Sequence, residues 1–261
     1  MTTALIILAI VLLAVNIFLF RRYVDYREKL KFKGVFGSWP IRQVPIDQID
    51  PIFKINEFGP TLDTTVKFIG RGSLRVPGGT SDVEAWILSV FAKKSKNIFE
   101  LGTCTGKTSY LMALNSPANA TVTTLTLGPD QLAAYDKKSE DFSGAIKDAL
   151  DESVFNKFLY TGTPEETKIK QLFNDSKLFD EKEFAASMDL IFIDGSHAYS
   201  YVVSDSEKAL KMVAPNGIIL WHDYRGPHLN KDVFKALNEL SKKLPLIHIK
   251  DTSLIMYRHS S

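Results

Sequence analysis

The chain has 261 residues, of which 45% are hydrophobic and 24% are charged, and this composition excludes a disordered or fibrous chain and allows one or two globular domains. Lys and Arg number 32 against 30 Asp and Glu, so the net charge of +2 is too balanced for a protein whose main partner is nucleic acid. The one cysteine, Cys104, excludes an intrachain disulfide and a cysteine-rich zinc module, and it is typical of a reducing compartment.

Residues 4–20 form an apolar run with no charge and one clearly polar side chain, Asn16. A helix of about 20 residues is roughly 30 Å long, which matches the hydrocarbon core of a bilayer. A cleaved signal peptide would begin with basic residues and end at small ones, whereas no Lys or Arg precedes this run and bulky residues close it. The sequence therefore predicts a retained transmembrane anchor over residues 1–20, which crosses the membrane once.

A basic flank follows the apolar run. By the positive-inside rule it lies in the cytoplasm, so we expect a single-pass membrane protein whose globular part is on the cytoplasmic side. Contact with anionic lipid headgroups is a second role that such a flank can have. The flank contains Asp25 and Glu28 against six basic residues, which are Arg21, Arg22, Arg27, Lys29, Lys31 and Lys33.

Residues 21–78 join this flank to a proline-containing lead without sustained periodicity, typical of a connecting or lid-like segment that packs on the domain. Residues 79–261 alternate between helix-like and strand-like patterns, and a capping box from Ser81 to Glu84 predicts the first helix. The alternation predicts a mostly parallel sheet with helices on both faces. The other predicted helices are 107–115, 141–151 and 201–213; the strands are 97–101, 121–125, 169–173, 189–193 and 217–221, followed by an antiparallel hairpin, 246–249 and 253–257.

The segment FELGTCTGKT, residues 99–108, lies where the first of these strands turns into a helix, the place where open α/β sheets bind ligands. It lacks the third glycine of a dinucleotide fingerprint. It is close to a phosphate-binding P-loop, with Gly106, Lys107 and Thr108 in place, but the Glu100 carboxylate would repel a triphosphate. An acid followed by two glycines suits a ligand with an ammonium group and a ribose, as in S-adenosylmethionine.

Four segments carry a resemblance to a known family. FELGTCTGKTS resembles motif I of class I S-adenosylmethionine-dependent methyltransferases, and the other three are similar to methyltransferase family 24, over roughly residues 79–257. The resemblance implies a Rossmann-like α/β fold, a seven-stranded mostly parallel sheet with an antiparallel last strand and helices on both faces. The other three segments are NDSKLFD (174–180), DLIFIDGSHAYSYVVSDSEKAL (189–210) and PNGIILWHDY (215–224).

The resemblance also implies a set of cofactor-binding residues. The first loop would line the methionine and ribose side, and the loop after the third strand would lie near the adenine. Many relatives carry an acid at the end of the second strand, where this chain has Thr126, and a threonine hydroxyl is a weaker partner for the ribose. Asp130 is a possible substitute. The predicted cofactor residues are Glu100, Gly102, Thr103, Gly106, Thr126, Asp175 and Ser176.

Asp194 closes one predicted strand and His222 and Asp223 close the next, so these three side chains are expected at neighbouring carboxyl ends of the sheet. By position they fall on the divalent-metal pattern of related O-methyltransferases. Two carboxylates and an imidazole suit manganese, iron or zinc better than magnesium. The sequence therefore predicts Asp194, His222 and Asp223 as metal ligands, with Asp194 and Asp223 also counted as catalytic.

His197 offers a route without a metal, since an imidazole near its ordinary pKa can accept the proton of an attacking hydroxyl. The alternative is that His197 only packs the loop that enters the next helix. Asp205, on that helix, is expected to be a solvated or capping residue, and Trp221 a buried strand aromatic or the floor of the substrate site.

Together these features predict a membrane-anchored, S-adenosylmethionine-dependent methyltransferase that acts on a hydroxyl of a small molecule, lipid or saccharide. Two alternatives stay open: a P-loop-like nucleotide-binding protein, and a non-catalytic membrane-tethered scaffold that keeps the fold, which the absence of an acid at Thr126 favours. Neither the acceptor nor the oligomeric state follows from the sequence, because fold does not specify function.

Overall fold

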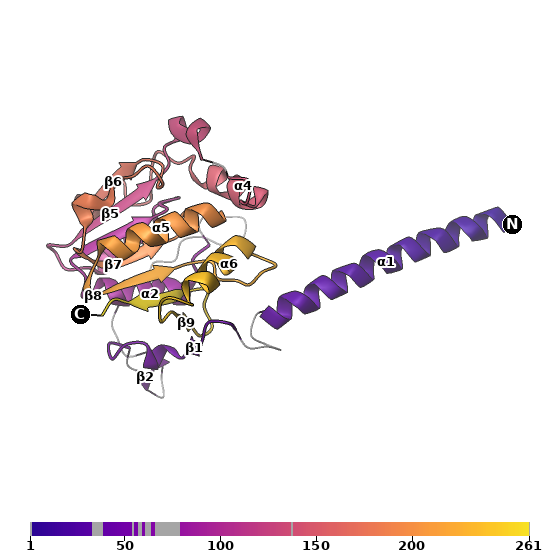
Figure 1. The fold of residues 1–261 in the computed structure, drawn as a ribbon, viewed down its shortest axis with the longest axis horizontal. Coiled ribbons are helices and arrows are strands. Elements are labelled where there is room, and N and C mark those ends of the chain that lie inside the picture. The colour runs from indigo at the N-terminus through magenta and orange to yellow at the C-terminus, as the bar shows by residue number, and fades with distance from the viewer. Residues whose placement is uncertain are drawn as a thin grey trace.

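The computed structural model describes residues 2–32, 39–53, 55–56, 59–60, 64–65, 79–136 and 138–260. A long N-terminal helix, α1 (Thr2–Phe32), is followed by an α/β domain, and Figure 1 shows the helix projecting away from it. Residues 5–26 of α1 are apolar enough to cross a membrane, and none of this stretch is buried. The Asn16 amide donates to the Leu12 carbonyl at 2.8 Å, so its polar group is satisfied within the helix. Lys33 and most of 54–78 lie outside the described residues.

The sheet of the domain has eight strands among the described residues, in the order β1-β9-β10-β8-β7-β4-β5-β6. β10 (Ile255–Arg258) runs antiparallel to both its neighbours, and the other pairs are parallel. The predicted Rossmann-like sheet with a reversed last strand is therefore confirmed. The remaining strands are β1 (Gln43–Val44), β4 (Asn97–Leu101), β5 (Thr121–Thr126), β6 (Ile169–Phe173), β7 (Met188–Ile193), β8 (Val213–Trp221) and β9 (Ile247–Ile249); β2 (Ile55–Asn56) and β3 (Gly59–Pro60) form a separate ribbon.

The eighth strand, β1, comes from the lead and pairs with β9 at the edge of the sheet. The segment after it adds apolar side chains to the core, since Ile49, Ile52 and Phe53 are all buried. β1 has only two residues and lies between two prolines, so no sequence pattern indicates it. The predicted number of strands, seven, is therefore one fewer than the structure shows among the described residues. Residues 39–53 of the lead therefore pack as part of the domain.

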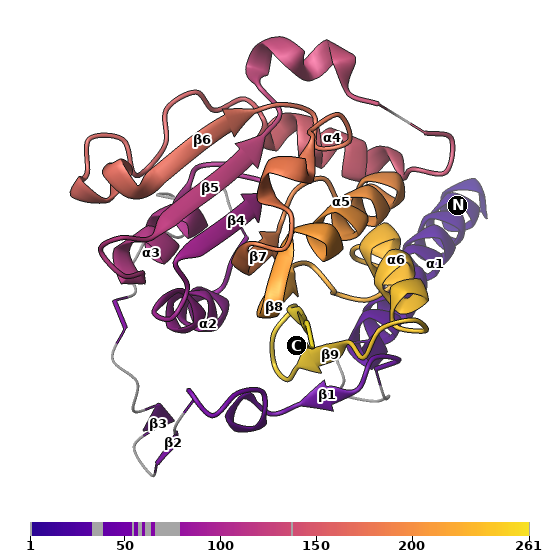
Figure 2. The same cartoon turned by 60° about the vertical axis from the view of Figure 1, so that its left-hand side comes forward.

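Helices cover both faces of the sheet, as predicted, and Figure 2 shows the two layers. One face packs α2 (Asp82–Ala92) and α3 (Lys107–Asn115); the other packs α5 (Tyr199–Met212) and α6 (Lys231–Leu240). Alternation along β4 divides its side chains between the two cores, because Phe99 and Leu101 face α5 and α6 whereas Ile98 faces α2 and α3. Glu100 therefore shares the face of Ile98.

A long connection between β5 and β6 contains α4 (Ser143–Glu152), flanked by the short 3₁₀ turns η3 (Pro129–Ala134) and η4 (Pro164–Lys168); a third turn, η5 (Glu181–Phe184), precedes β7. Figures 1 and 2 show α4 beyond the carboxyl ends of the central strands. The helix is amphipathic but has one buried residue, Ala145. It lies over an opening at this end of the sheet.

Candidate active site

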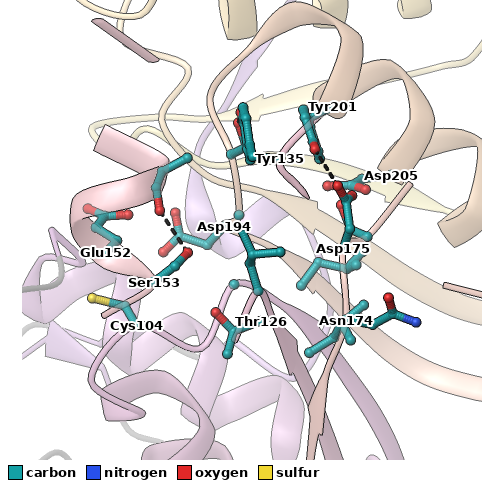
Figure 3. Close-up of a pocket in the computed structure, with 18 residues that line it drawn as sticks. Cys104, Thr126, Tyr135, Glu152, Ser153, Asn174, Asp175, Asp194, Tyr201 and Asp205 are labelled. Atoms are coloured by element: carbon teal, nitrogen blue, oxygen red, sulfur yellow. Dashed lines mark hydrogen bonds between the residues drawn. The ribbon is translucent and has the colours of Figure 1, made fainter. Parts of the chain in front are cut away.

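A pocket opens at the carboxyl ends of β4, β5, β6 and β7, where the topology of the sheet brings four loops together. The space between its walls is about 530 Å³, part of it open to solvent. The first loop supplies Gly102 and Cys104, β5 supplies Thr126, and the end of α4 supplies Glu152 and other residues. Figure 3 shows these side chains around the pocket. The position agrees with the predicted ligand site.

Gly102 holds this loop against the loop that follows β7. It has φ of +102°, and a Cβ atom here would lie 2.1 Å from the Asp194 carbonyl oxygen. The sequence predicts that Gly102 contacts the cofactor. The structure shows a close approach of the Asp194 backbone, which fixes one pocket wall against the other.

Glu100 does not line the pocket, which differs from the predicted contact with the ligand. Its side chain is fully buried and accepts hydrogen bonds from the hydroxyls of Thr108, Ser109 and Thr124. Burial raises the pKa of Glu100 to about 7, although these three hydroxyls act to lower it. β4 continues to Leu101, so Glu100 is one residue inside the strand and points under α3.

Two other predicted cofactor residues also turn away from the pocket. Thr103 is buried, with its hydroxyl 2.7 Å from that of Thr124 and accepting from the Gln171 amide. Gly106 caps α3 with φ of +76°, and a Cβ there would lie 2.6 Å from the Tyr160 ring. Their roles are to shape the loop, and only Gly102 of the predicted first-loop residues faces the pocket.

The other predicted cofactor residues, Thr126 for the ribose and Asp175 and Ser176 for the adenine, all line the pocket. Asp175 is already engaged: Oδ2 accepts from the Tyr201 hydroxyl at 2.7 Å and Oδ1 from the Lys177 backbone N–H at 2.8 Å. Tyr201 stacks on Tyr135 with ring centroids 4.6 Å apart. These contacts give the pocket a rigid aromatic and acidic wall.

Asp205 differs from its predicted solvated or capping role. It is 1% exposed and lines the pocket, and its Oδ1 has no hydrogen-bond partner among the described residues. Burial raises the pKa of Asp205 to about 7, opposed by a hydrogen bond from Ser176 and the charge of Lys208. By contrast, Trp221 is buried and donates to the Ser206 hydroxyl, which supports its interpretation as a core aromatic.

Beside the pocket lies a cluster of acidic and imidazole groups at the ends of β7 and β8. His222 Nδ1 lies 2.9 Å from Asp194 Oδ1 and 3.4 Å from Asp223 Oδ2, while His222 Nε2 lies 3.3 Å from Glu84 Oε2. His197 Nε2 lies 2.6 Å from Asp223 Oδ2. The residues that the sequence predicted at neighbouring strand ends therefore do meet, and Asp194 also lines the pocket.

Charge pairing dominates the cluster. Burial by itself lowers the pKa of His222, but Asp194 and Asp223 raise it well above its ordinary value. Burial would raise the pKa of Asp223, yet the charges of His222 and His197 hold it well below its ordinary range. The Arg225 guanidinium adds a further contact, with Nε 2.8 Å from Asp223 Oδ1. Asp223 is thus a buried carboxylate among three cations.

His197 is also a cation in this arrangement. Burial acts to lower its pKa, but the charge and hydrogen bond of Asp223 and the charges of Asp194 and Glu152 raise it to about 9. The predicted route without a metal requires that His197 has a pKa near the ordinary value of an imidazole. With the pKa raised, the ring is protonated at neutral pH and cannot itself accept a proton.

A divalent cation that displaced the proton of His197 would find three ligand groups in this cluster, with a different imidazole from the one predicted. Ligand atoms of Asp194, His197 and Asp223 lie within 4.8 Å of one another. His222 lies behind them, its side chain 1% exposed. Two buried atoms, His222 Nδ1 and Asp223 Oδ1, make no aligned hydrogen bond within the described part of the chain. Carboxylates and an imidazole are ligands for manganese, iron or zinc.

Several residues around the site were missed from the sequence. Glu84 lies behind His222 and accepts hydrogen bonds from the backbone N–H and the hydroxyl of Ser253, each at 2.7 Å. The sequence predicts the capping box that Glu84 forms with Ser81, but not its contact with Ser253. Arg225 follows the HDY motif directly. Glu152 lies one residue beyond the predicted helix 141–151, in the connection between β5 and β6, and no motif indicates that it faces the pocket.

The P-loop interpretation finds no support in Lys107. Its amino group donates to the Thr80 carbonyl at 2.8 Å, and the residue does not line the pocket. A phosphate-binding lysine must reach the ligand.

Comparison with known proteins agrees with this geometry. Residues 99–224 match the family model described as a methyltransferase domain. The O-methyltransferase NovP is similar in structure, with a TM-score of 0.52, 15% identity, and coverage of 70% of this chain and 84% of that chain. A protein from Corynebacterium glutamicum has a TM-score of 0.50, 10% identity, and coverage of 70% and 83%. No curated protein matches the chain in sequence. The structural similarities show the fold.

Proposed function

Because residues 99–224 form a methyltransferase domain of the class I fold, we propose that this protein transfers the methyl group of S-adenosylmethionine to a hydroxyl oxygen of a small-molecule, lipid or saccharide acceptor. One observation carries the proposal. The pocket at the carboxyl ends of the sheet and the acidic cluster share Asp194, so a ligand in the pocket would lie next to charged groups suited to an acceptor hydroxyl.

The pocket offers a place for each part of this cofactor. Gly102 and Cys104 would lie along the methionine part, Thr126 near the ribose, and Asn174, Asp175 and Ser176 near the adenine. Asp175 is held in place by Tyr201. When bound, the cofactor supplies a methyl group on a sulfonium, whose transfer to oxygen leaves S-adenosylhomocysteine and one proton.

Asp194 is the residue best placed to serve the acceptor, because it belongs to both the pocket and the cluster. Its carboxylate would orient the acceptor hydroxyl and take the proton that leaves the oxygen. His222, whose Nδ1 lies 2.9 Å from Asp194 Oδ1, would hold Asp194 in place, and the rings of His222 and His197 would balance its charge. Catalysis would come mainly from alignment of the acceptor with the methyl group.

Asp194, His197 and Asp223 would hold a divalent cation, which would acidify the acceptor hydroxyl. The close grouping of their ligand atoms supports His197 in place of His222 as the imidazole ligand. His222 is enclosed between Glu84 and Asp194.

We also propose that α1 anchors the protein in a membrane with the domain on the cytoplasmic side. The length and apolar composition of residues 5–26 support the span, and Arg21, Arg22 and Arg27 after the apolar run support the orientation.

Ligand binding to the full chain in detergent tests the proposed function. Calorimetry should show that S-adenosylhomocysteine binds and that ATP and GTP with magnesium do not. A variant Asp175→Asn should weaken binding, while the exposed Glu207→Gln should leave it unchanged. If ATP or GTP bound and S-adenosylhomocysteine did not, the P-loop alternative would be supported and the proposal overturned.

Methyl transfer tests the catalytic part. Radiolabelled S-adenosylmethionine and manganese are incubated with the protein and a membrane extract, and label is measured in lipid and aqueous phases. Label in either phase, lost in Asp194→Asn while S-adenosylhomocysteine still binds, is the expected result. Binding without transfer into either phase would favour the non-catalytic scaffold, which Thr126 at the strand end keeps open.

A further inference from the structure

Glu152 is a carboxyl group at the pocket that neither the family pattern nor the site described above uses. It is the last residue of α4 and lines the pocket together with Ser153, Cys104 and Asp194. Figure 3 shows its side chain on the same side of the pocket as Cys104 and Asp194, across from Asp175 and Asp205. It therefore lies at the end formed by the first loop.

This carboxyl group is not engaged by the protein. Among the described residues it makes no hydrogen bond or ion pair, whereas its neighbour Asp151 pairs with Lys147 at 2.5 Å. It is half-buried, and it stands at the carboxyl end of a helix, where the helix dipole disfavours a negative charge. A negative charge on Glu152 at this position is therefore energetically unfavourable.

The surroundings of Glu152 are mainly negative. Burial raises its pKa to about 7; His197 acts to lower it, and the charges of Asp194, Asp223 and Asp148 raise it further. Glu152 also contributes to raising the pKa of the Cys104 thiol to about 12, after the larger effect of burial. A cationic group of a ligand at this end would relieve the repulsion and restore the charge on the carboxyl.

The first loop was expected to bind the amino acid part of the cofactor through Glu100, which instead points under α3. We propose that Glu152 takes this role and binds the ammonium group of the methionine part of S-adenosylmethionine. The proposal rests on the proposed function. It makes α4, an element outside the sheet, part of the cofactor site.

5′-Methylthioadenosine lacks the whole amino acid part of S-adenosylhomocysteine, its carboxylate as well as its ammonium group. A loss confined to S-adenosylhomocysteine therefore locates the contact at that part, and the removal of a negative charge weakens binding only where the contact is with the ammonium group. Binding of each to the full chain in detergent is measured by calorimetry for the wild type, Glu152→Gln and Glu152→Asp. Glu207→Gln, an exposed acid on α5, is the control. Urea unfolding midpoints check that each variant is folded.

We expect Glu152→Gln to bind S-adenosylhomocysteine about 10-fold or more weakly, as for loss of a charged hydrogen bond, and to bind 5′-methylthioadenosine like the wild type. Glu152→Asp should recover part of the loss, and Glu207→Gln should show no loss. Unchanged binding of S-adenosylhomocysteine by Glu152→Gln, or an equal loss for both ligands, would overturn this role while the proposed function stands. No binding of S-adenosylhomocysteine by the wild type would overturn both.

Discussion

At the scale of single residues, Glu100 shows how burial sets the charge of a carboxyl group. Three hydroxyls donate to it, yet the loss of water outweighs them and raises its pKa to about 7 from 4.5. An acid whose pKa is raised by folding contributes stability below pH 4.5, and this contribution is lost as the pH rises towards 7. The ionised group is a local cost at neutral and alkaline pH.

We therefore predict that Glu100→Gln raises the free energy of unfolding at pH 8, by up to about 3 kcal/mol, and changes it little at pH 5. The amide keeps the size of the side chain and carries no charge. Urea unfolding at the two pH values measures the effect. A gain of the same size at both pH values would show that packing, and not ionisation, is responsible.

Glu84 joins three parts of the molecule. Its carboxylate caps α2 through Ser81, accepts from Ser253 and lies 3.3 Å from His222. Burial alone would raise its pKa, but His222 and these backbone N–H groups hold it well below its ordinary value. Removal of its charge would leave the cation of His222 buried with fewer partners.

Glu84→Gln should lower the free energy of unfolding at pH 7 by about 3 kcal/mol. The loss should shrink below pH 4, where the free carboxyl of the unfolded wild type becomes protonated and the contribution of a lowered pKa is lost. Glu207→Gln, exposed on α5, is the control. A loss within 0.5 kcal/mol, the usual range for surface substitutions, would contradict the central role of this carboxylate.

At the scale of elements, the loops after β4 and β7 are locked together at Gly102. An added Cβ would lie 2.1 Å from the Asp194 carbonyl oxygen, a distance that no side-chain rotation relieves. Since Asp194 belongs to both pocket and cluster, movement of this contact would disturb both.

Gly102→Ala should therefore destabilise the domain and abolish binding of S-adenosylhomocysteine together. Gly162→Ala is a matched control, because Gly162 also has a positive φ, +79°, but has open space where the Cβ would be. It should cost only backbone strain, roughly 1–2 kcal/mol, and leave binding intact. Thermal unfolding and calorimetry compare the two. Equal effects would show that φ alone requires Gly102.

The regular elements were predictable, and these include the inserted helix α4, for which the sequence predicts a helix over 141–151. The apolar residues of β4 and β7 and the capping box of α2 determine their positions within a residue. α6 was left unassigned, although Val233, Ala236, Leu237 and Leu240 repeat with helical spacing. Glu100 lies in the strand that the sequence predicts, 97–101, but the alternation of side chains along this strand turns its carboxyl group under α3 and away from the pocket. Glu152 reaches the site by tertiary packing of an insertion, which no local pattern records.

At the scale of the whole molecule, the segment between α1 and the predicted domain belongs in part to the domain itself. β1 and residues 49–53 complete the sheet edge and core, whereas residues 5–26 of α1 bury nothing against the rest. The two parts should therefore respond differently to removal.

The full chain should sediment with membranes and resist extraction at alkaline pH. Deletion of residues 2–32 should release a folded, soluble domain. Deletion of residues 2–53 should unfold it, because β1 and the side chains of Ile49, Ile52 and Phe53 are lost. Fractionation and thermal unfolding measure both. A full chain found in the soluble fraction would contradict the anchor, and a stable domain from the longer deletion would contradict the role of the lead.

The short distance along the chain between Phe32 and Trp39 has a consequence for substrate encounter. Seven residues span at most about 25 Å, so a domain held by α1 in a bilayer would search only a thin shell above the lipid surface. Acceptors dissolved in that bilayer would then meet the enzyme by lateral diffusion at a high local concentration, and modest intrinsic affinity for them would be enough.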